Sequence, residues 1–286
     1  MTPVTWVDVF ATGPMTGNQL AVVGDADGLS DEKMGHIAAE FGISETTFVC
    51  SAREGGDHRV RIFTPESELP MAGHPLVGTA WVLHNAGLMA GRGVLETGVG
   101  PLSVQADRAG GNMIQAPPEA GALLDPEELA SACGAPAGET APAGVWSTGV
   151  PQAMFAVADD AALADAEPDL AALRRLGERD GWIGISAYSL IAASHGVARV
   201  RVRHFAPGLG IPEDPVTGSA AGALGACLAA AGLAEAGALE LTVWQGAMLR
   251  RPGRVDVAVD APGGDPREVS VGGRVLPVME GRLVDA

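Results

Sequence analysis

Two stretches of this sequence repeat each other and decide how the chain folds: Arg59-Val60-Arg61-Ile62-Phe63-Thr64-Pro65 and Arg201-Val202-Arg203-His204-Phe205-Ala206-Pro207. A second pair follows each of them, since His74-Pro75-Leu76-Val77-Gly78-Thr79-Ala80 resembles Asp214-Pro215-Val216-Thr217-Gly218-Ser219-Ala220. A weaker pair opens each half, at residues 16–22 and 148–154. Three matches in the same order on both sides predict a chain made of two related halves.

The elements of each half follow from residue patterns. Alternating polar and apolar residues predict half-buried strands over Arg59–Phe63 and Arg201–Phe205. Ser30 is a favoured N-cap and Gly42 a favoured stop, and apolar residues with helical spacing lie between them. A helix over residues 31–41 and a strand over Thr46–Cys50 are therefore expected.

Two further helices, Leu76–Ala86 and Val216–Ala231, are apolar or small on nearly every face, which is typical of a buried helix. The residues before them follow one pattern, an N-cap and then a proline at the first helical position: His74 with Pro75, and Asp214 with Pro215. Each half is thus expected to be a curved sheet around one central helix. We place the join in the Pro- and Ala-rich stretch 117–142.

The starts of these two helices are candidate anion sites, because a helix N-terminus presents unpaired N–H groups and a partial positive charge. If the halves pack about a pseudo-twofold axis, Gly73/His74 and Gly218/Ser219 bind one carboxylate from two sides. The alternative is that Pro, Gly and Ser only begin two buried helices. The repetition of the pattern favours a site.

Glu45 is the candidate base. It lies between Ser44 and Thr46, ahead of an apolar strand, and the corresponding stretch of the second half, Gly181–Ser186, contains no acid. A single base on one side suggests that one group takes a proton and returns it. An isolated glutamate of this kind is otherwise a solvated loop residue.

Five motifs in order resemble the phenazine-biosynthesis PhzF family: Thr16-Gly17-Asn18, Ser44-Glu45-Thr46-Thr47-Phe48, Arg61-Ile62-Phe63-Thr64-Pro65, Ala72-Gly73-His74-Pro75 and Glu213-Asp214-Pro215-Val216-Thr217-Gly218-Ser219. The resemblance covers nearly the whole chain. It implies the diaminopimelate-epimerase-like α/β (α+β) fold, in which two pseudo-symmetric halves are each a mixed barrel around a helix, with the active site between them.

The resemblance also implies roles for particular residues. Glu45 is expected to transfer the proton, with help from His74 and Asp214. The substrate carboxylate is expected to bind at Gly73, Gly218 and Ser219, with Asn18 in the same site. We accordingly expect residues 1–117 to carry Glu45 and His74, and residues 118–286 to carry Asp214, leaving open that the last strand returns to the first half.

Composition narrows the possible partners. The net charge is −17, with 18 basic residues against 35 acidic ones, so nucleic acid and anionic membranes would be repelled. The start of the chain lacks a basic region and carries Asp8 in its apolar run, and the longest apolar stretch, Ser219–Leu233, is too short to span a bilayer. A cytoplasmic protein is expected, and a homodimer is left open. Cys50, Cys133 and Cys227 are scattered and suggest neither a disulfide framework nor a zinc site.

The function expected from these observations is a cofactor-independent isomerase of secondary metabolism. It would move a proton on a small carboxylate-bearing metabolite, by a double-bond shift or an enol/keto tautomerisation, with no metal and no nucleotide. Two alternatives stay open. One is a racemase or epimerase of the same fold, which we expect to carry a cysteine at each central-helix start. The other is a protein that binds small carboxylates without turnover.

Overall fold

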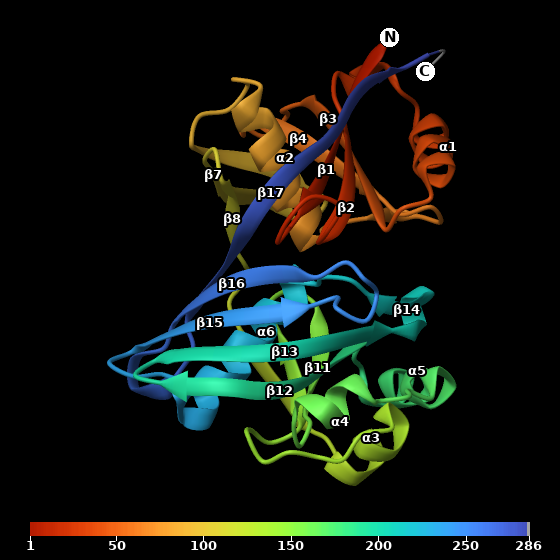
Figure 1. The fold of residues 1–286 in the computed structure, drawn as a ribbon. Helices are drawn as coiled ribbons and strands as arrows, with labels where there is room; N and C mark the ends of the chain where they lie inside the picture. The colour runs from red at the N-terminus through yellow and green to blue at the C-terminus, as the bar shows by residue number, and fades with distance from the viewer. Residues whose placement is uncertain (285–286) are drawn as a thin grey trace. The chain divides into compact units, whose positions relative to one another are not determined.

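The computed structural model describes residues 1–284, and the chain divides into two compact units. The first unit contains residues 1–114 and the C-terminal segment from Gly272, and the second contains Gln115–Val271. The chain passes from the first unit to the second between Ile114 and Gln115. Strand β17 (Glu268–Leu283) begins in the second unit and ends in the first (Figure 1).

In the first unit, strands close into a mixed barrel. They pair in the order β1, β2, β3, β4, β6, β7, β8 and β17, and β17 pairs in turn with β1. The β2–β3 and β4–β6 pairs are parallel. The strands are β1 (Thr2–Val9), β2 (Asn18–Val23), β3 (Glu45–Ser51), β4 (His58–Phe63), β6 (Arg92–Thr97), β7 (Gly100–Ala106) and β8 (Gly110–Ile114), with the short β5 (Glu68–Leu69) beside β4.

Helix α1 (Asp31–Phe41) follows the short η1 (Ala26–Gly28) and covers the outside of this barrel (Figure 1). Its ends confirm the sequence prediction. The Ser30 side chain accepts a hydrogen bond from the Lys33 N–H, and Gly42 adopts the left-handed conformation with φ 62°. Met34 on its inner face packs in one cluster with Phe48 of β3.

Helix α2 (Gly73–Asn85) runs through the interior of the first barrel and is buried over most of its length. Gly78 allows its close approach to β1 and β2. A Cβ added there would lie 2.5 Å from Leu20 Cδ2 and 2.7 Å from Val9 Cγ2. The helix can therefore sit in the barrel only because this position has no side chain.

The second unit repeats this plan around α6 (Gly218–Leu228). Its strands pair in the order β9, β10, β11, β12, β13, β15 and β16, and β16 neighbours the start of β17. The Gln115 N–H, just ahead of β9, donates to the Val269 carbonyl of β17 at 2.9 Å and links the two edges. The strands are β9 (Glu119–Leu123), β10 (Gly144–Ser147), β11 (Pro151–Ala156), β12 (Gly184–Ser194), β13 (Val197–Ala206), β14 (Ile211–Asp214), β15 (Ala238–Gln245) and β16 (Gly253–Asp260).

Helices α3 (Pro126–Cys133), α4 (Asp160–Ala164) and α5 (Leu170–Asp180) gather on one side of the second unit (Figure 1). Leu129 and Leu173 from these helices join Phe155 and Phe205 from the strands in one core cluster. The remaining short turns are η2 (Pro207–Leu209), η3 (Ala229–Leu233) and η4 (Pro262–Gly264). None of the helices within residues 1–284 combines the length and apolarity needed to cross a lipid bilayer.

Strand register shows how closely the two units correspond. In the first unit Leu20 of β2 pairs in parallel with Glu45 of β3, and in the second Gln152 of β11 pairs in parallel with Gly184 of β12. The prediction of a mixed α/β fold with two similar halves, each wrapped around a central helix, is confirmed. Gly184 occupies the position that Glu45 has in the first unit.

The predicted starts of the central helices are wrong by a few residues. Helix α2 begins at Gly73 with Ala72 as N-cap, so His74 and Pro75 lie inside its first turn. This costs the helix no hydrogen bond at proline, because the first four N–H groups lack intrahelical partners. Helix α6 begins at Gly218 with Thr217 as N-cap.

Asp214 is therefore no N-cap but the last residue of β14, and Pro215 precedes α6 instead of opening it. The cause is a side chain distant in sequence. The Thr217 N–H donates to Gln245 Oε1 at 3.2 Å, which holds this residue in an extended conformation with φ −113°. Helix α6 consequently begins at Gly218, directly after Thr217.

Candidate active site

Glu45 is the first residue of β3 and is largely buried in the first unit. Gly42 ends α1, and two residues later the chain enters β3, which fixes the Glu45 backbone beside Leu20. The exposed fraction of its side chain is 13%. Among residues 1–284, Glu45 Oε2 is buried without a hydrogen-bond partner. An unpaired buried carboxyl oxygen is costly for stability and is found chiefly where function needs it.

Burial raises the pKa of Glu45 from 4.5 to about 7, and a hydrogen bond from Ser44 offsets part of this effect. The cause is desolvation, because the ionised form loses its hydration in the protein interior. At neutral pH the protonated and ionised forms are therefore both populated. A carboxyl in this state can take a proton and give it back with little difference in free energy.

His74, near the start of α2, places its imidazole beside Glu45. His74 Nε2 lies 3.4 Å from Glu45 Oε2 and 3.3 Å from the Gln19 carbonyl oxygen. His74 Nδ1 lies 3.4 Å from the Asn18 side-chain nitrogen. A carbonyl oxygen only accepts and an amide nitrogen only donates, so these neighbours assign the hydrogen to Nε2 and leave Nδ1 bare. The imidazole N–H thus donates to the Gln19 carbonyl oxygen, and the carboxyl of Glu45 lies beside it.

Asn18 is oriented by Ser44, whose hydroxyl donates to Asn18 Oδ1 at 3.2 Å. The hydroxyl has one hydrogen, so it serves either Asn18 or Glu45 at any moment. A change in the ionisation of Glu45 is therefore coupled, through Ser44, to the amide that contacts His74. Asn18, Glu45 and His74 thus lie together in the first unit, with Gly73 next to His74 at the start of α2, and their roles in a reaction stay a prediction.

In the second unit, Asp214 closes β14 with an exposed fraction of 8%. The Thr217 hydroxyl donates to Asp214 Oδ2. Gln245 Nε2 donates both to the Asp214 carbonyl oxygen at 2.9 Å and to Thr217 Oγ1 at 3.1 Å. The Thr217 side chain thus contacts the Asp214 carboxylate and the Gln245 side chain contacts the Asp214 backbone, and sequence reasoning assigned neither side chain to the site.

The start of α6 carries the two other predicted residues of this unit, Gly218 and Ser219. Their N–H groups, like those of every helix start, have no intrahelical acceptor. Their carbonyl groups are fixed from outside the helix. Gln115 Nε2 donates to the Gly218 oxygen at 3.1 Å, and the Thr148 hydroxyl donates to the Ser219 oxygen at 3.3 Å. That the two groups of residues serve one substrate stays a prediction.

The place of Glu45 in the second unit is filled differently. A Cβ on Gly184 would meet His204 Nε2 at 2.6 Å and Gln152 Oε1 at 2.8 Å. His204 is buried, burial lowers its pKa to about 4, and its Nδ1 lies 3.0 Å from Ser186 Oγ. A neutral imidazole therefore takes up the space, and the second unit has no carboxyl at the position that Glu45 occupies in the first.

The cysteines do not lie at the helix starts. Cys50, Cys133 and Cys227 are free and buried, and burial raises the pKa of the Cys133 and Cys227 thiols to about 12. Thiols of this kind are inert. Within the described part of the chain, no group of three His, Cys, Asp or Glu residues is placed to hold a metal ion.

The fold and these residues define a class of protein. It has two α/β barrels, and one of them holds a buried carboxyl with a pKa near 7 beside an imidazole. The family described as phenazine biosynthesis-like protein matches residues 7–281. The chain belongs to this family, the PhzC-PhzF family.

Relatives and solved structures agree with this assignment. Trans-2,3-dihydro-3-hydroxyanthranilate isomerase of Pseudomonas aeruginosa is 35% identical over 282 residues, covering 96% of this chain and 97% of that protein. The crystal structure of a Bacillus anthracis phenazine biosynthesis protein of the PhzF family matches with a TM-score of 0.88, at 30% identity and 99% coverage of both chains. A predicted epimerase from Pseudomonas aeruginosa matches with a TM-score of 0.82, at 32% identity and full coverage of both. The chain is an isomerase.

Proposed function

We propose that this isomerase moves one proton on a small carboxylate-bearing metabolite, with Glu45 as the general acid and base and without a cofactor. The observation that carries the proposal is the burial of Glu45, which brings its pKa to about 7 beside the imidazole of His74. An acid–base group is most effective with a pKa near the working pH, which an exposed glutamate does not have.

In the proposed reaction, one carboxyl removes a proton from the substrate and returns it at another carbon. Ionised Glu45 removes a proton from a carbon next to a carbonyl or its vinylogue, and the C–H electron pair moves into the conjugated system. The protonated carboxyl then returns the proton to another carbon, so that a double bond has shifted and Glu45 is ionised again. His74 Nε2 lies 3.4 Å from Glu45 Oε2, so the N–H dipole of the imidazole helps to stabilise the negative charge while Glu45 is ionised.

The substrate carboxylate is the second part of the proposal. The carboxylate binds to backbone N–H groups at the starts of the two central helices: Gly218 and Ser219 of α6, and Gly73 of α2. Asp214 assists the proton transfer at the substrate. Asn18 contributes its side-chain amide to the site. The protein is strongly acidic overall, so these local donors bind the anion without help from the net charge.

The substrate in the name of the Pseudomonas aeruginosa relative, trans-2,3-dihydro-3-hydroxyanthranilate, is a small carboxylate and serves as the probe substrate. The test uses this compound labelled with deuterium at the carbon that loses hydrogen, in ordinary water, and follows product by NMR during the first turnovers. A shielded single base predicts that part of the label appears at the newly protonated carbon. Complete loss of label to water would count against one shielded base.

An epimerase is the second candidate, because one solved structure of high similarity bears that description. The helix starts argue against a thiol pair, since Ala72-Gly73 and Thr217-Gly218 stand there and the three thiols are buried elsewhere. Incubation with free L-amino acids in deuterated water separates the candidates. Exchange of the α-hydrogen with inversion would favour the epimerase over the double-bond isomerase.

A further inference from the structure

Four hydrogen bonds converge on the turn between β14 and α6, and three of them involve Gln245 at the end of β15. Its Nε2 donates to the Asp214 carbonyl oxygen and to Thr217 Oγ1, and its Oε1 accepts from the Thr217 N–H. The fourth bond runs from the Thr217 hydroxyl to Asp214 Oδ2. Gln245 is buried, with an exposed fraction of 3%. One amide thus contacts both ends of the turn.

These bonds have a direction. The Thr217 hydroxyl has one hydrogen, and Gln245 already donates to its oxygen. The hydroxyl hydrogen is therefore left to point at Asp214 Oδ2, which receives it as a charge-assisted hydrogen bond when Asp214 is ionised. The same glutamine fixes the backbone of Thr217, the residue that opens α6.

We propose that Gln245 is a positioning residue for the isomerase: it directs the Thr217 hydroxyl onto Asp214 and fixes where α6 begins. This inference rests on the proposed function, which gives Asp214 a part in proton transfer and the start of α6 a part in carboxylate binding. Gln245 acts through Thr217 and Asp214. A loss of Gln245 consequently affects both proton transfer and carboxylate binding. A loss of the Thr217 hydroxyl removes the donor to Asp214 but leaves the bond from the Thr217 N–H to Gln245, which fixes the start of α6.

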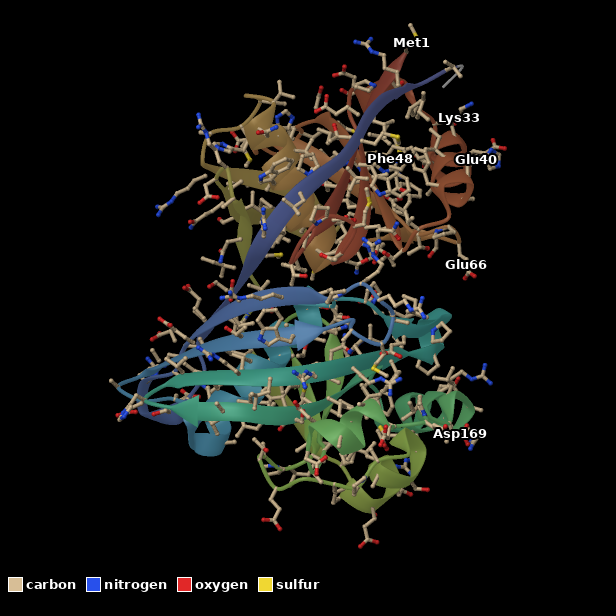
Figure 2. The ribbon with its side chains drawn as sticks, viewed as in Figure 1. Met1, Lys33, Glu40, Phe48, Glu66 and Asp169 are labelled. Carbon is tan, nitrogen blue, oxygen red and sulfur yellow. The ribbon has the colours of Figure 1, made fainter. Side chains whose placement is uncertain are left out.

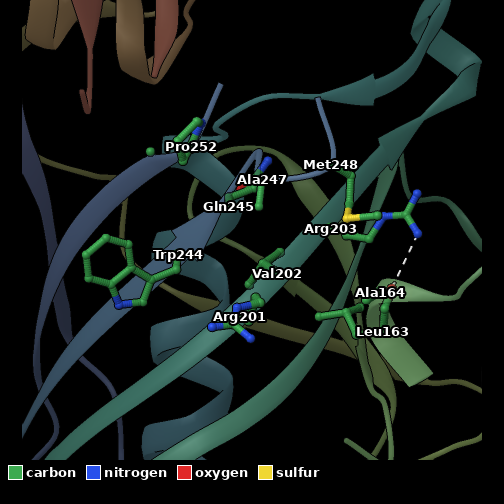
Figure 3. A pocket seen from close by; sticks show the side chains of 11 residues that line it. Leu163, Ala164, Arg201, Val202, Arg203, Trp244, Gln245, Ala247, Met248 and Pro252 are labelled. Carbon is green, nitrogen blue, oxygen red and sulfur yellow. Dashed lines mark hydrogen bonds between the residues drawn. The ribbon is translucent and has the colours of Figure 1, made fainter. Parts of the chain in front are cut away.

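A hollow of about 190 Å³ beside Gln245 supplies a matched control. Figure 3 shows Gln245 next to Ala247 in its wall, with Met248 nearby. Met248 lines the same hollow, is 52% exposed, and makes none of the four bonds of the turn. Met248→Leu therefore changes the hollow but leaves the turn intact, whereas Gln245→Met removes the amide and keeps the length of the side chain.

The first readout needs no substrate. Amide hydrogen exchange is measured at Thr217, whose N–H donates to Gln245, and at Ala221, whose N–H donates to the Thr217 carbonyl oxygen at 3.0 Å. Exchange at both should accelerate at least about 10-fold in Gln245→Met and stay unchanged in Met248→Leu. Gln245→Leu, which also removes the donor and the acceptor of the amide, covers the case of a poorly folded methionine variant. Unchanged exchange in both Gln245 variants would overturn the inference.

The second readout is kinetic and uses the probe substrate. Thr217→Val should lower kcat about 10-fold with little change in KM, and Thr217→Ser should restore it, because serine keeps the hydroxyl. Gln245→Met should lower kcat and raise KM together. Wild-type kcat in Thr217→Val and Gln245→Met would refute a positioning role. If the wild-type protein itself does not turn over the probe, the proposed function fails for this compound, and hydrogen exchange alone decides on Gln245.

Discussion

Replacing Glu45 by glutamine should stabilise the folded protein above neutral pH. The pKa of Glu45 is about 7 in the folded protein against an ordinary 4.5, because burial disfavours the charged form. The folded state therefore binds this proton more tightly than the unfolded state, so ionisation lowers the free energy of unfolding as pH rises from 4.5 to 7. The difference between the two pKa values corresponds to roughly 3 kcal/mol. Glutamine resembles the neutral acid and escapes this loss.

The assay is urea unfolding of wild type and Glu45→Gln at pH 5 and pH 8. The advantage of the variant in free energy of unfolding should grow by about 2.5 kcal/mol between these conditions. Glu40→Gln is the matched control, since it makes the same substitution on the exposed face of α1 (Figure 2). An advantage of Glu45→Gln that is equal at both pH values would refute the burial argument.

Three further outcomes are expected. The kcat/KM of wild type for the probe substrate should rise with pH and level off above about 7, because Glu45 must ionise before it can take a proton. A kcat/KM that is constant from pH 5 to 9 would contradict this. Gly78→Ala should lower the free energy of unfolding by about 1–3 kcal/mol, because the added Cβ would collide with Leu20 and Val9. Gly35→Ala, on α1 where a Cβ meets no other atom, should raise the free energy of unfolding by roughly 0.5–1 kcal/mol. Urea unfolding of both variants measures these changes. Dialysis against EDTA should leave kcat unchanged, and activity lost by dialysis but regained with a divalent metal would show that a cofactor is needed.

The fold was predictable because its decisive information is repeated in the sequence. The two copies of the Arg-x-Arg strand became β4 and β13, and both have the same neighbours in register: Thr46 pairs with Phe63, and Ile185 with Phe205. Helix α1 was predictable for another reason. Its N-cap, apolar face and Gly42 are all local, so no distant contact could move its ends.

The starts of the central helices were less predictable because distant residues set them. Thr217 opens α6 through its bond to Gln245, which is 28 residues away along the chain. Nothing in the local sequence around Gln245 marks it as part of this turn. The asymmetry of the repeat identified Glu45 as a candidate. The raised pKa of Glu45 could not be predicted from the sequence, because desolvation depends on how β2, β3 and α2 pack around the side chain.

The most direct test of the account is the turnover of the probe substrate by Glu45→Gln. The substitution keeps the shape of the side chain but removes the group that takes the proton, so kcat should fall by at least about 10²-fold while the affinity for the substrate changes little. Isothermal titration with the probe substrate verifies that binding is retained. If Glu45→Gln turns over the probe substrate at the wild-type rate, Glu45 is not the acid–base group, and His74 and Asp214 become the candidates in its place.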